Sequence, residues 1–192
     1  MRRNPVVLLH GLWDTAARFD PLCAHLHERG WTTHRFDFAP GNGDAGLDSL
    51  AQQTADYVER TFRGGETIDL VGFSMGGLVA RYYLQRLAKP GRVERLVTIS
   101  SPHRGTWMAF LLGNPGARQM RPGSAFLKDL DADRHVLRRV GFTSVWTPMD
   151  LMILPASSSA IPEARAVRIN VPVHHLMLTD TRVSRIVEIA LS

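Results

Sequence analysis

The clearest candidate for a reactive side chain in this sequence is a serine in a glycine-flanked pentapeptide. Residues 72–76 read Gly-Phe-Ser-Met-Gly and lie between a predicted strand, residues 68–72, and a predicted helix, residues 75–87. On such a strand-to-helix turn the serine backbone is strained and its hydroxyl is exposed, while the glycines remove side chains that would clash. The pentapeptide alone arises by chance in many chains, but this context is specific. We therefore predict that Ser74 is a nucleophile for acyl transfer.

A serine hydroxyl is a weak nucleophile at neutral pH, so a general base must accompany it. His174 and His175 stand between the last predicted strand and the terminal helix. Adjacent residues in an extended segment point in opposite directions, so only one of them can face Ser74. The same geometry makes them a poor metal-binding pair, and no carboxylate or cysteine at ligand spacing lies nearby. The sequence predicts one histidine base and neither a metal nor a cofactor, with the choice of histidine open.

The base needs an orienting carboxylate, and Asp150 is the best-placed candidate. It follows the predicted strand at residues 142–146 across a Thr-Pro turn, at the carboxyl edge of the sheet. Asp129, Asp131 and Asp133 fall in a helical segment and are interpreted as its solvated face. We predict that Asp150 is the acid.

Acyl transfer also needs amide donors for the oxyanion of the tetrahedral intermediate. The segment His10-Gly11-Leu12 directly follows the first predicted strand, where a backbone amide can point at the nucleophile. The second donor would be the amide of Met75. His10 itself is interpreted as a residue that holds this loop.

Strand and helix patterns alternate along the chain and determine where these residues must lie. Continuous apolar runs predict buried strands, and helical spacing of apolar residues recurs between them. The predicted strands are residues 6–9, 32–38, 68–72, 93–99, 142–146 and 166–169; the predicted helices are residues 20–29, 47–62, 75–87 and 183–191. This alternation predicts an α/β fold with a parallel sheet of about six strands, helices on both faces and functional groups at the carboxyl ends of the strands. Residues 1–192 are expected to form one domain.

Composition excludes several other classes of protein. The formal charge is +5, but the basic residues are scattered, so we expect no nucleic-acid function. Cys23 is the only cysteine, which favours a reducing compartment. No signal peptide and no membrane-spanning run are recognised. We expect a cytoplasmic protein with no integral membrane association, as a monomer or weak homo-oligomer.

Taken together, these motifs resemble the α/β-hydrolase superfamily, and within it the small lidless bacterial lipases and esterases. The resemblance extends over nearly the whole chain and rests on residues 6–11, 71–77, 101–106, 149–150 and 174–183. It implies that Leu12 and Met75 form the oxyanion hole. In similar sequences the catalytic histidine precedes a Met-Leu or Leu-Leu pair by three residues, which here implies His174. The loose segment through Gly141 is too small to be a separate cap domain.

The resemblance implies a hydrolase for carboxylic acyl esters, an esterase or lipase possibly of the triacylglycerol type. Trp13, Phe73 and Trp107 are expected to line an acyl groove. A thioesterase, an acyltransferase or an amidase would use the same three catalytic residues, and fold alone does not separate them. A non-catalytic binding protein of this fold is a further alternative, although such proteins typically lose one of the three residues.

Overall fold

The computed structural model describes residues 3–192 and contains one parallel sheet of six strands. The strands are β1 (Val6–Leu9), β2 (Thr33–Arg35), β3 (Ile68–Phe73), β4 (Val93–Ile99), β5 (Gly141–Trp146) and β6 (Arg165–Arg168), in the spatial order β2-β1-β3-β4-β5-β6. The chain runs from β1 outward to β2 and then returns to β3 on the other side of β1. That reversal opens a crevice at the carboxyl ends of β1 and β3. The predicted parallel sheet of about six strands is confirmed.

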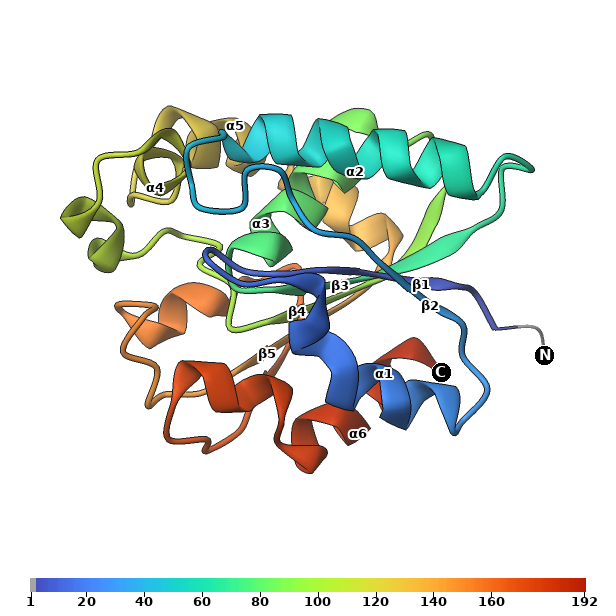
Figure 1. Ribbon diagram of the computed structural model, residues 1–192. Coiled ribbons are helices and arrows are strands. Elements are labelled where there is room, and N and C mark those ends of the chain that lie inside the picture. Colours follow the sequence, from blue (N-terminus) through green and yellow to red (C-terminus); the bar gives the residue numbers. More distant parts are fainter. Residues whose placement is uncertain (1–2) are drawn as a thin grey trace.

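Helices cover both faces of the sheet (Figure 1). One layer contains α2 (Leu47–Thr61), α3 (Met75–Tyr82), α4 (Pro115–Gln119) and α5 (Ala125–Ala132), and the other contains α1 (Asp20–His27) and α6 (Thr181–Leu191). The side chains of β1 alternate between the layers: Val7 and Leu9 pack with α2 and α3, while Val6 and Leu8 pack with α1 and α6. This burial on both faces explains why the strand is a continuous apolar run.

Two predicted elements differ by three or more residues at one end from the structure. The strand expected at residues 32–38 is β2, which ends at Arg35, because Phe38 turns away and its amide donates to the His10 ring. The helix expected at residues 75–87 is α-helical only to Tyr82 and closes with a wider π turn, Tyr83–Leu87. Neither difference changes the position of Ser74.

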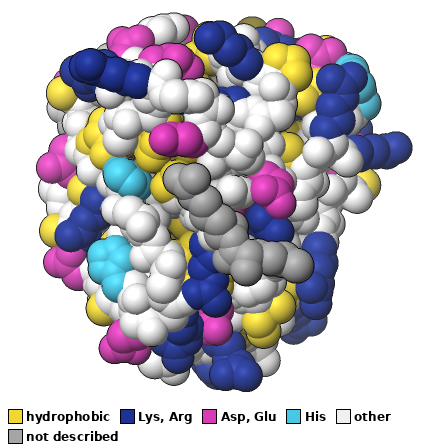
Figure 2. Space-filling model, turned by 90° about the vertical axis from the view of Figure 1, so that its right-hand side faces the viewer, with side chains coloured by type: hydrophobic (Ala, Val, Ile, Leu, Met, Phe, Trp, Pro, Cys, Tyr) yellow, Lys and Arg dark blue, Asp and Glu magenta, His cyan; other side chains and the backbone are white. Residues whose placement is uncertain are grey.

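The loops after β1, β4, β5 and β6 gather at the carboxyl edge of the sheet. The segment between β4 and β5 adds a 3₁₀ helix, Trp107–Leu111, as well as α4, α5 and a second 3₁₀ helix, Arg134–Arg139. The opposite, amino-terminal edge carries charged side chains of both signs with only small, separate hydrophobic patches (Figure 2). None of the described helices has both the length and the hydrophobicity needed to cross a membrane.

Candidate active site

Ser74 occupies the sharp turn between β3 and α3 that its sequence context predicts. Its φ of 53° and ψ of −122° lie outside the regions that side chains ordinarily favour. The turn depends on glycine at both ends. A Cβ at Gly72 would lie 2.5 Å from the Cα of Gly77, and a Cβ at Gly76 would collide with the carbonyl oxygen of Leu9. The glycines therefore let α3 approach the ends of β1 and β3, which raises the serine above the sheet edge.

His174 and Asp150 form a buried pair beside this turn. The Nδ1 of His174 donates to Oδ2 of Asp150 at 2.7 Å, and both side chains are almost completely buried. The Phe73 ring, adjacent in sequence to Ser74, packs on the His174 ring with a centroid separation of 4.8 Å. His174 is thus fixed between the acid and the residue that precedes the serine.

The carboxylate of Asp150 is also held by its own loop. Its Oδ1 accepts hydrogen bonds from the amides of Met152 and Ile153, at 2.9 and 3.0 Å. Burial alone would raise the pKa of Asp150, but the hydrogen bonds from His174, Ile153 and Met152 outweigh it and lower the pKa below its usual value. The carboxylate therefore stays ionised beside the imidazole. The two amide donors were missed in the sequence, although an aspartate that bonds amides two and three residues ahead is a common local turn.

The two histidines take different positions. His174 is buried against Asp150, whereas His175 is exposed, with its ring 5.5 Å from that of His174 and nearly perpendicular to it. His175 still lines the pocket, but no hydrogen bond joins it to a carboxylate among residues 3–192. The structure thus places the histidine implied by the resemblance next to Asp150.

The backbone amides of Leu12 and Met75 are available for a ligand. Met75 begins α3, so its amide has no acceptor within the helix. Within the described chain, the amide of Leu12 has no hydrogen-bond acceptor either. The loop is held by His10, whose Nδ1 donates to the Gly11 carbonyl at 2.9 Å and whose Nε2 accepts from the Phe38 amide at 3.0 Å. His10 has the loop-holding position that the sequence suggested.

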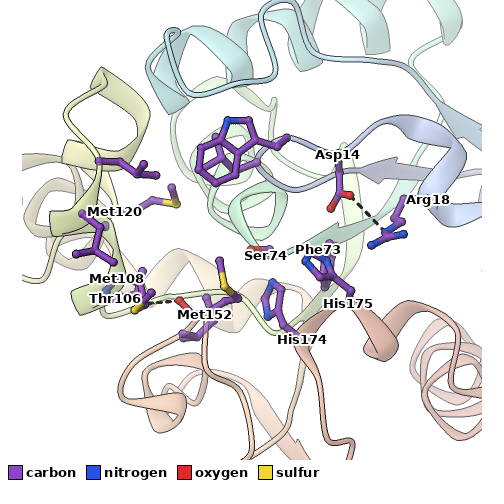
Figure 3. A pocket seen from close by; sticks show the side chains of 16 residues that line it. Asp14, Arg18, Phe73, Ser74, Thr106, Met108, Met120, Met152, His174 and His175 are labelled. Carbon is purple, nitrogen blue, oxygen red and sulfur yellow. Dashed lines mark hydrogen bonds and ion pairs between the residues drawn. The ribbon is translucent and has the colours of Figure 1, made fainter.

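A pocket of about 450 Å³ lies over these residues (Figure 3). Ser74, His174, Leu12, Trp13 and Phe73 all line it. Much of the remaining wall is apolar. Leu111 and Leu112 after β4 belong to a segment that the sequence suggested for an acyl groove, whereas the other apolar lining residues were not singled out: Met108, Ala109 and Met120 after β4, and Met152 and Ile153 after β5. Asp14, Arg18 and His175 add a polar end, where Arg18 pairs with Asp14 at 3.3 Å.

The three residues expected to line an acyl groove take different positions. Trp107 does not line the pocket; its side chain is 61% exposed and stacks on Phe110 with a centroid separation of 5.4 Å. Phe73 lines the pocket but is fully buried, and it supports His174. Trp13 is 59% exposed at the pocket and has a positive φ of 59°, a strained conformation for a tryptophan.

Thr106 connects the two loops that supply the apolar wall. Its hydroxyl donates to the Met152 carbonyl at 2.9 Å and accepts from the Leu154 amide at 2.9 Å. The Trp107 amide donates to the Leu154 carbonyl at 2.9 Å and extends this connection. The loop after β4 is therefore tied to the loop that carries Asp150.

No cluster of His, Cys, Asp or Glu in residues 3–192 is arranged to hold a metal ion.

The chain is similar in sequence to known lipases and thioesterases. A family model of palmitoyl protein thioesterases matches residues 5–111. A triacylglycerol lipase of Pseudarthrobacter phenanthrenivorans is 29% identical over 115 residues, which are 56% of this chain and 35% of the lipase. Palmitoyl-protein thioesterase 3 of Dictyostelium discoideum is 28% identical over 107 residues, 53% of this chain and 37% of that protein. The matched segment thus spans about a third of the length of these curated relatives.

The fold also matches solved structures. The mature form of the Bacillus licheniformis lipase BlEst2 superposes with a TM-score of 0.82 at 15% sequence identity, covering 99% of this chain and 92% of that one. Sheet order, the serine turn and this superposition show the α/β-hydrolase fold, and the family model and the lipase relative confirm the resemblance to the lipases and esterases. Within that class, the match to more than half of the chain shows that it belongs to the palmitoyl protein thioesterase family.

Proposed function

We propose that this protein is a serine hydrolase that cleaves carboxylic acyl esters through Ser74, His174 and Asp150. The observation that carries the proposal is the buried 2.7 Å hydrogen bond between Asp150 and His174, beside a pocket that His174 shares with a serine on a strained turn. Neither the hydrogen bond nor the serine turn alone identifies a hydrolase. Together they supply a base, an orienting acid and a raised hydroxyl at one edge of the sheet.

The hydrogen bond to Asp150 determines which histidine nitrogen can react. Because Nδ1 donates its proton to the carboxylate, Nε2 is left as the acceptor for the Ser74 proton. As Ser74 Oγ attacks the acyl carbon, its proton passes to Nε2, and the imidazolium is stabilised by ionised Asp150. His174 then gives this proton to the departing alcohol oxygen, which leaves an acyl-enzyme. Water attacks the acyl-enzyme with the same histidine as base, restoring Ser74 and releasing the acid.

The amides of Leu12 and Met75 are proposed to bind the oxyanion of both tetrahedral intermediates. Each lies next to a residue that the structure holds firmly: Leu12 follows the loop fixed by His10, and Met75 follows the serine itself. Fixed donors of this kind lower the barrier by about 3 kcal/mol each, because they need no reorganisation as charge develops.

The acyl chain is proposed to occupy the apolar wall of the pocket. Met108, Met120 and Met152 contribute flexible, apolar side chains there (Figure 3). This wall supports an acyl group as the recognised portion of the substrate.

The cytoplasmic location and the monomeric or weakly oligomeric state stay predictions from the sequence.

Thioester hydrolysis is a second candidate because the matching family model is that of palmitoyl protein thioesterases. The same residues would act on a thioester, whose thiolate leaves more readily and needs less help from His174 as an acid. Initial rates with an oxygen ester and a thioester of the same acyl chain measure this choice. A higher kcat/KM for the thioester, after correction for the uncatalysed rates, would favour the second candidate.

Replacing the nucleophile tests the shared mechanism. The Ser74→Ala protein should keep its circular dichroism spectrum and unfolding midpoint but lose p-nitrophenyl ester turnover by a factor of at least about 10³. Ser157→Ala is a matched control, because Ser157 is an exposed serine outside the pocket. Substantial turnover by folded Ser74→Ala protein would defeat the proposal for esters and thioesters alike.

A further inference from the structure

Thr106 is a buried threonine whose hydroxyl is fully engaged by backbone groups. The residue lines the pocket and is only 4% exposed. Its hydroxyl donates to the Met152 carbonyl at 2.9 Å and accepts from the amides of Leu154 and Met108, at 2.9 and 3.3 Å. A hydroxyl has one proton and two lone pairs, so these three bonds use all of them. The Thr106 hydroxyl is therefore not free to bind a substrate or to move a proton.

The hydroxyl holds the segment that supplies the amide donors of Asp150. It bonds to Met152 and Leu154, the residues on either side of Ile153. The amides of Met152 and Ile153 donate to Oδ1 of Asp150, at 2.9 and 3.0 Å. Met152 thus links the acid to Thr106, because its carbonyl is bonded to Thr106 (Figure 3) and its amide to Asp150.

Few other polar contacts fix residues 151–154. Apart from the bonds just described, one hydrogen bond reaches this segment within the described chain, from the Trp107 amide to the Leu154 carbonyl. Two of its four side chains are exposed, so packing alone would hold it loosely. Loss of the Thr106 hydroxyl would leave a carbonyl without its partner and allow the segment to shift. The Asp150 carboxylate would then lose the fixed positions of its two amide donors.

We propose that Thr106 is a positioning residue, which holds the Asp150 carboxylate in the orientation that His174 needs. It acts through residues 151–154, and its hydroxyl takes no part in the chemistry. The inference rests on the proposed function, because the orientation of His174 matters only if its Nε2 accepts the Ser74 proton. Oδ2 of Asp150 lies 2.7 Å from Nδ1 of His174, so the carboxylate directs the ring. A displacement of about 1 Å in such a group can lower a reaction rate by about 10²-fold.

The same contact connects the apolar wall of the pocket to the acid. Thr106 and Met152 both line the pocket. An acyl chain on this wall would lie against Met152, whose amide helps to hold Asp150. The segment that the substrate would contact is thus also the segment that fixes the charge beside His174. A residue in the loop after β4 can in this way affect an acid in the loop after β5.

Removing the hydroxyl at constant volume tests the proposal. In folded Thr106→Val protein, kcat for a p-nitrophenyl ester should fall by about 10- to 100-fold, with KM within about threefold of wild type, because the acid moves while the wall keeps its shape. Thr106→Ser keeps the hydroxyl and should hold kcat within about threefold. Thr54→Val is the matched control, since Thr54 is a fully buried threonine that bonds within α2. It should change kcat by less than about twofold. Unchanged kcat in Thr106→Val, or an equal fall in the control, would overturn the proposal.

A double-substitution cycle separates positioning from a general loss of structure. If Thr106 acts through Asp150, Thr106→Val should lower kcat by less than about threefold when Asp150→Asn is already present. An equal fall in both backgrounds would overturn the proposal, because Thr106 would then act independently of the acid. Thr106→Ala removes the same hydroxyl without placing a second methyl group against the backbone, so it carries the test if the valine protein does not fold.

Proton NMR reports on the acid without turnover. The Nδ1 proton of His174, held in a short bond to a carboxylate, should give a downfield signal that is absent from His174→Ala. The signal should persist in Thr106→Ser and Thr54→Val. In Thr106→Val it should exchange with water at least about tenfold faster, because the bond to Asp150 opens more readily.

These readouts distinguish failure of the positioning role from failure of the proposed function. An unchanged NMR signal in Thr106→Val would overturn the proposal. A wild-type protein whose signal depends on the Thr106 hydroxyl, but which hydrolyses neither esters nor thioesters, would contradict the proposed function and leave the positioning role supported. Turnover that does not depend on the hydroxyl would do the reverse.

Discussion

At the scale of single residues, the Asp150 carboxylate shows how a short loop fixes a charge. It accepts three hydrogen bonds, one from His174 and two from the amides of Met152 and Ile153. An ionised carboxylate this deeply buried is tolerated because its lone pairs are satisfied. The Asp150 carboxylate fixes the orientation of the His174 ring, which cannot turn without losing its hydrogen bond to Asp150 and its contact with Phe73.

Asp150→Asn should therefore reduce kcat much more than it reduces stability. An amide can donate to Nδ1 and stabilise the other tautomer, which leaves Nε2 protonated and unable to accept the Ser74 proton. We expect kcat for a p-nitrophenyl ester to fall by about 10³- to 10⁴-fold. Asp56→Asn, on the exposed face of α2, controls for the lost charge. A loss of less than tenfold in folded Asp150→Asn protein would show that another group orients the base.

Replacing His174 and His175 in turn compares the effect on turnover of two adjacent histidines. His174→Ala should lower turnover by a factor of about 10³ or more. His175→Ala should stay within about tenfold of wild type, because His175 has no carboxylate partner within the described part of the chain. Both variants remove the same side chain from the pocket lining, so each controls for the other. Equal losses, or a larger loss in His175→Ala, would contradict the assignment.

At the scale of elements, the serine turn is built by close contact between helix and strand. Gly76 at the start of α3 packs against the carbonyl oxygen of Leu9 at the end of β1. These two elements are distant in sequence and adjacent across the crevice at the reversal of strand order. A methyl group at this contact would push α3, and Ser74 with it, away from the loop that carries Leu12.

Gly76→Ala should consequently lower the free energy of unfolding by about 2 to 4 kcal/mol, because rigid backbone on both sides leaves no room for the methyl group. Urea unfolding measures this change. Gly113→Ala is the matched control, since a Cβ there meets nothing within 4 Å, and it should stay within about 0.5 kcal/mol of wild type. A midpoint for Gly76→Ala equal to that of the control would contradict the packing argument.

The elements themselves were largely predictable from sequence. The buried strand β1 is an unbroken apolar run, β3 and β4 are mostly apolar, and α2 and α6 have clear helical spacing, so their types and near boundaries follow from local pattern. β2 was predicted too long, because only the tertiary hydrogen bond from Phe38 to His10 shows where the chain leaves the sheet.

The pocket wall was much less predictable than the reactive residues. Ser74, Asp150 and His174 could be proposed because chemistry demands particular residue types at particular strand ends. Met120 and Met152 reach the pocket wall because the loops after β4 and β5 pack together. The hydrogen bond from the Thr106 hydroxyl to the Met152 carbonyl joins these two loops. No local sequence pattern predicts that contact. Trp107 was expected in the groove from the resemblance to small lipases, and the fold instead turns it to the surface.

At the scale of the whole molecule, the two edges of the sheet differ in the residues that they expose. The carboxyl edge carries the pocket and most of the exposed large hydrophobic side chains, and the amino edge carries charges and the buried Asp69 of β3. Asp69 accepts from the Arg95 amide at 3.0 Å and from the Asn4 side chain at 3.2 Å. Burial is the largest influence on it and raises its pKa to about 6.

Asp69 therefore makes stability depend on pH in a direction opposite to that of a paired surface carboxylate. Between its usual pKa of 3.8 and about 6, the folded state binds the proton more tightly than the unfolded chain, so the free energy of unfolding falls as pH rises. Asp69→Asn removes this dependence. We expect its stability relative to wild type to increase by up to about 3 kcal/mol from pH 4 to pH 7, measured by urea unfolding at both values. A stability difference that does not change with pH would contradict the raised pKa.

The central claim is that Ser74 is activated by His174 and Asp150, and covalent trapping tests it most directly. The protein is treated with a fluorophosphonate, and the modified peptide is identified by mass spectrometry. We predict one adduct, on the Ser74 hydroxyl, formed rapidly by wild type and at least about 10³-fold more slowly by His174→Ala. An adduct on another residue, or labelling of Ser74 at the same rate in folded His174→Ala protein, would contradict the account.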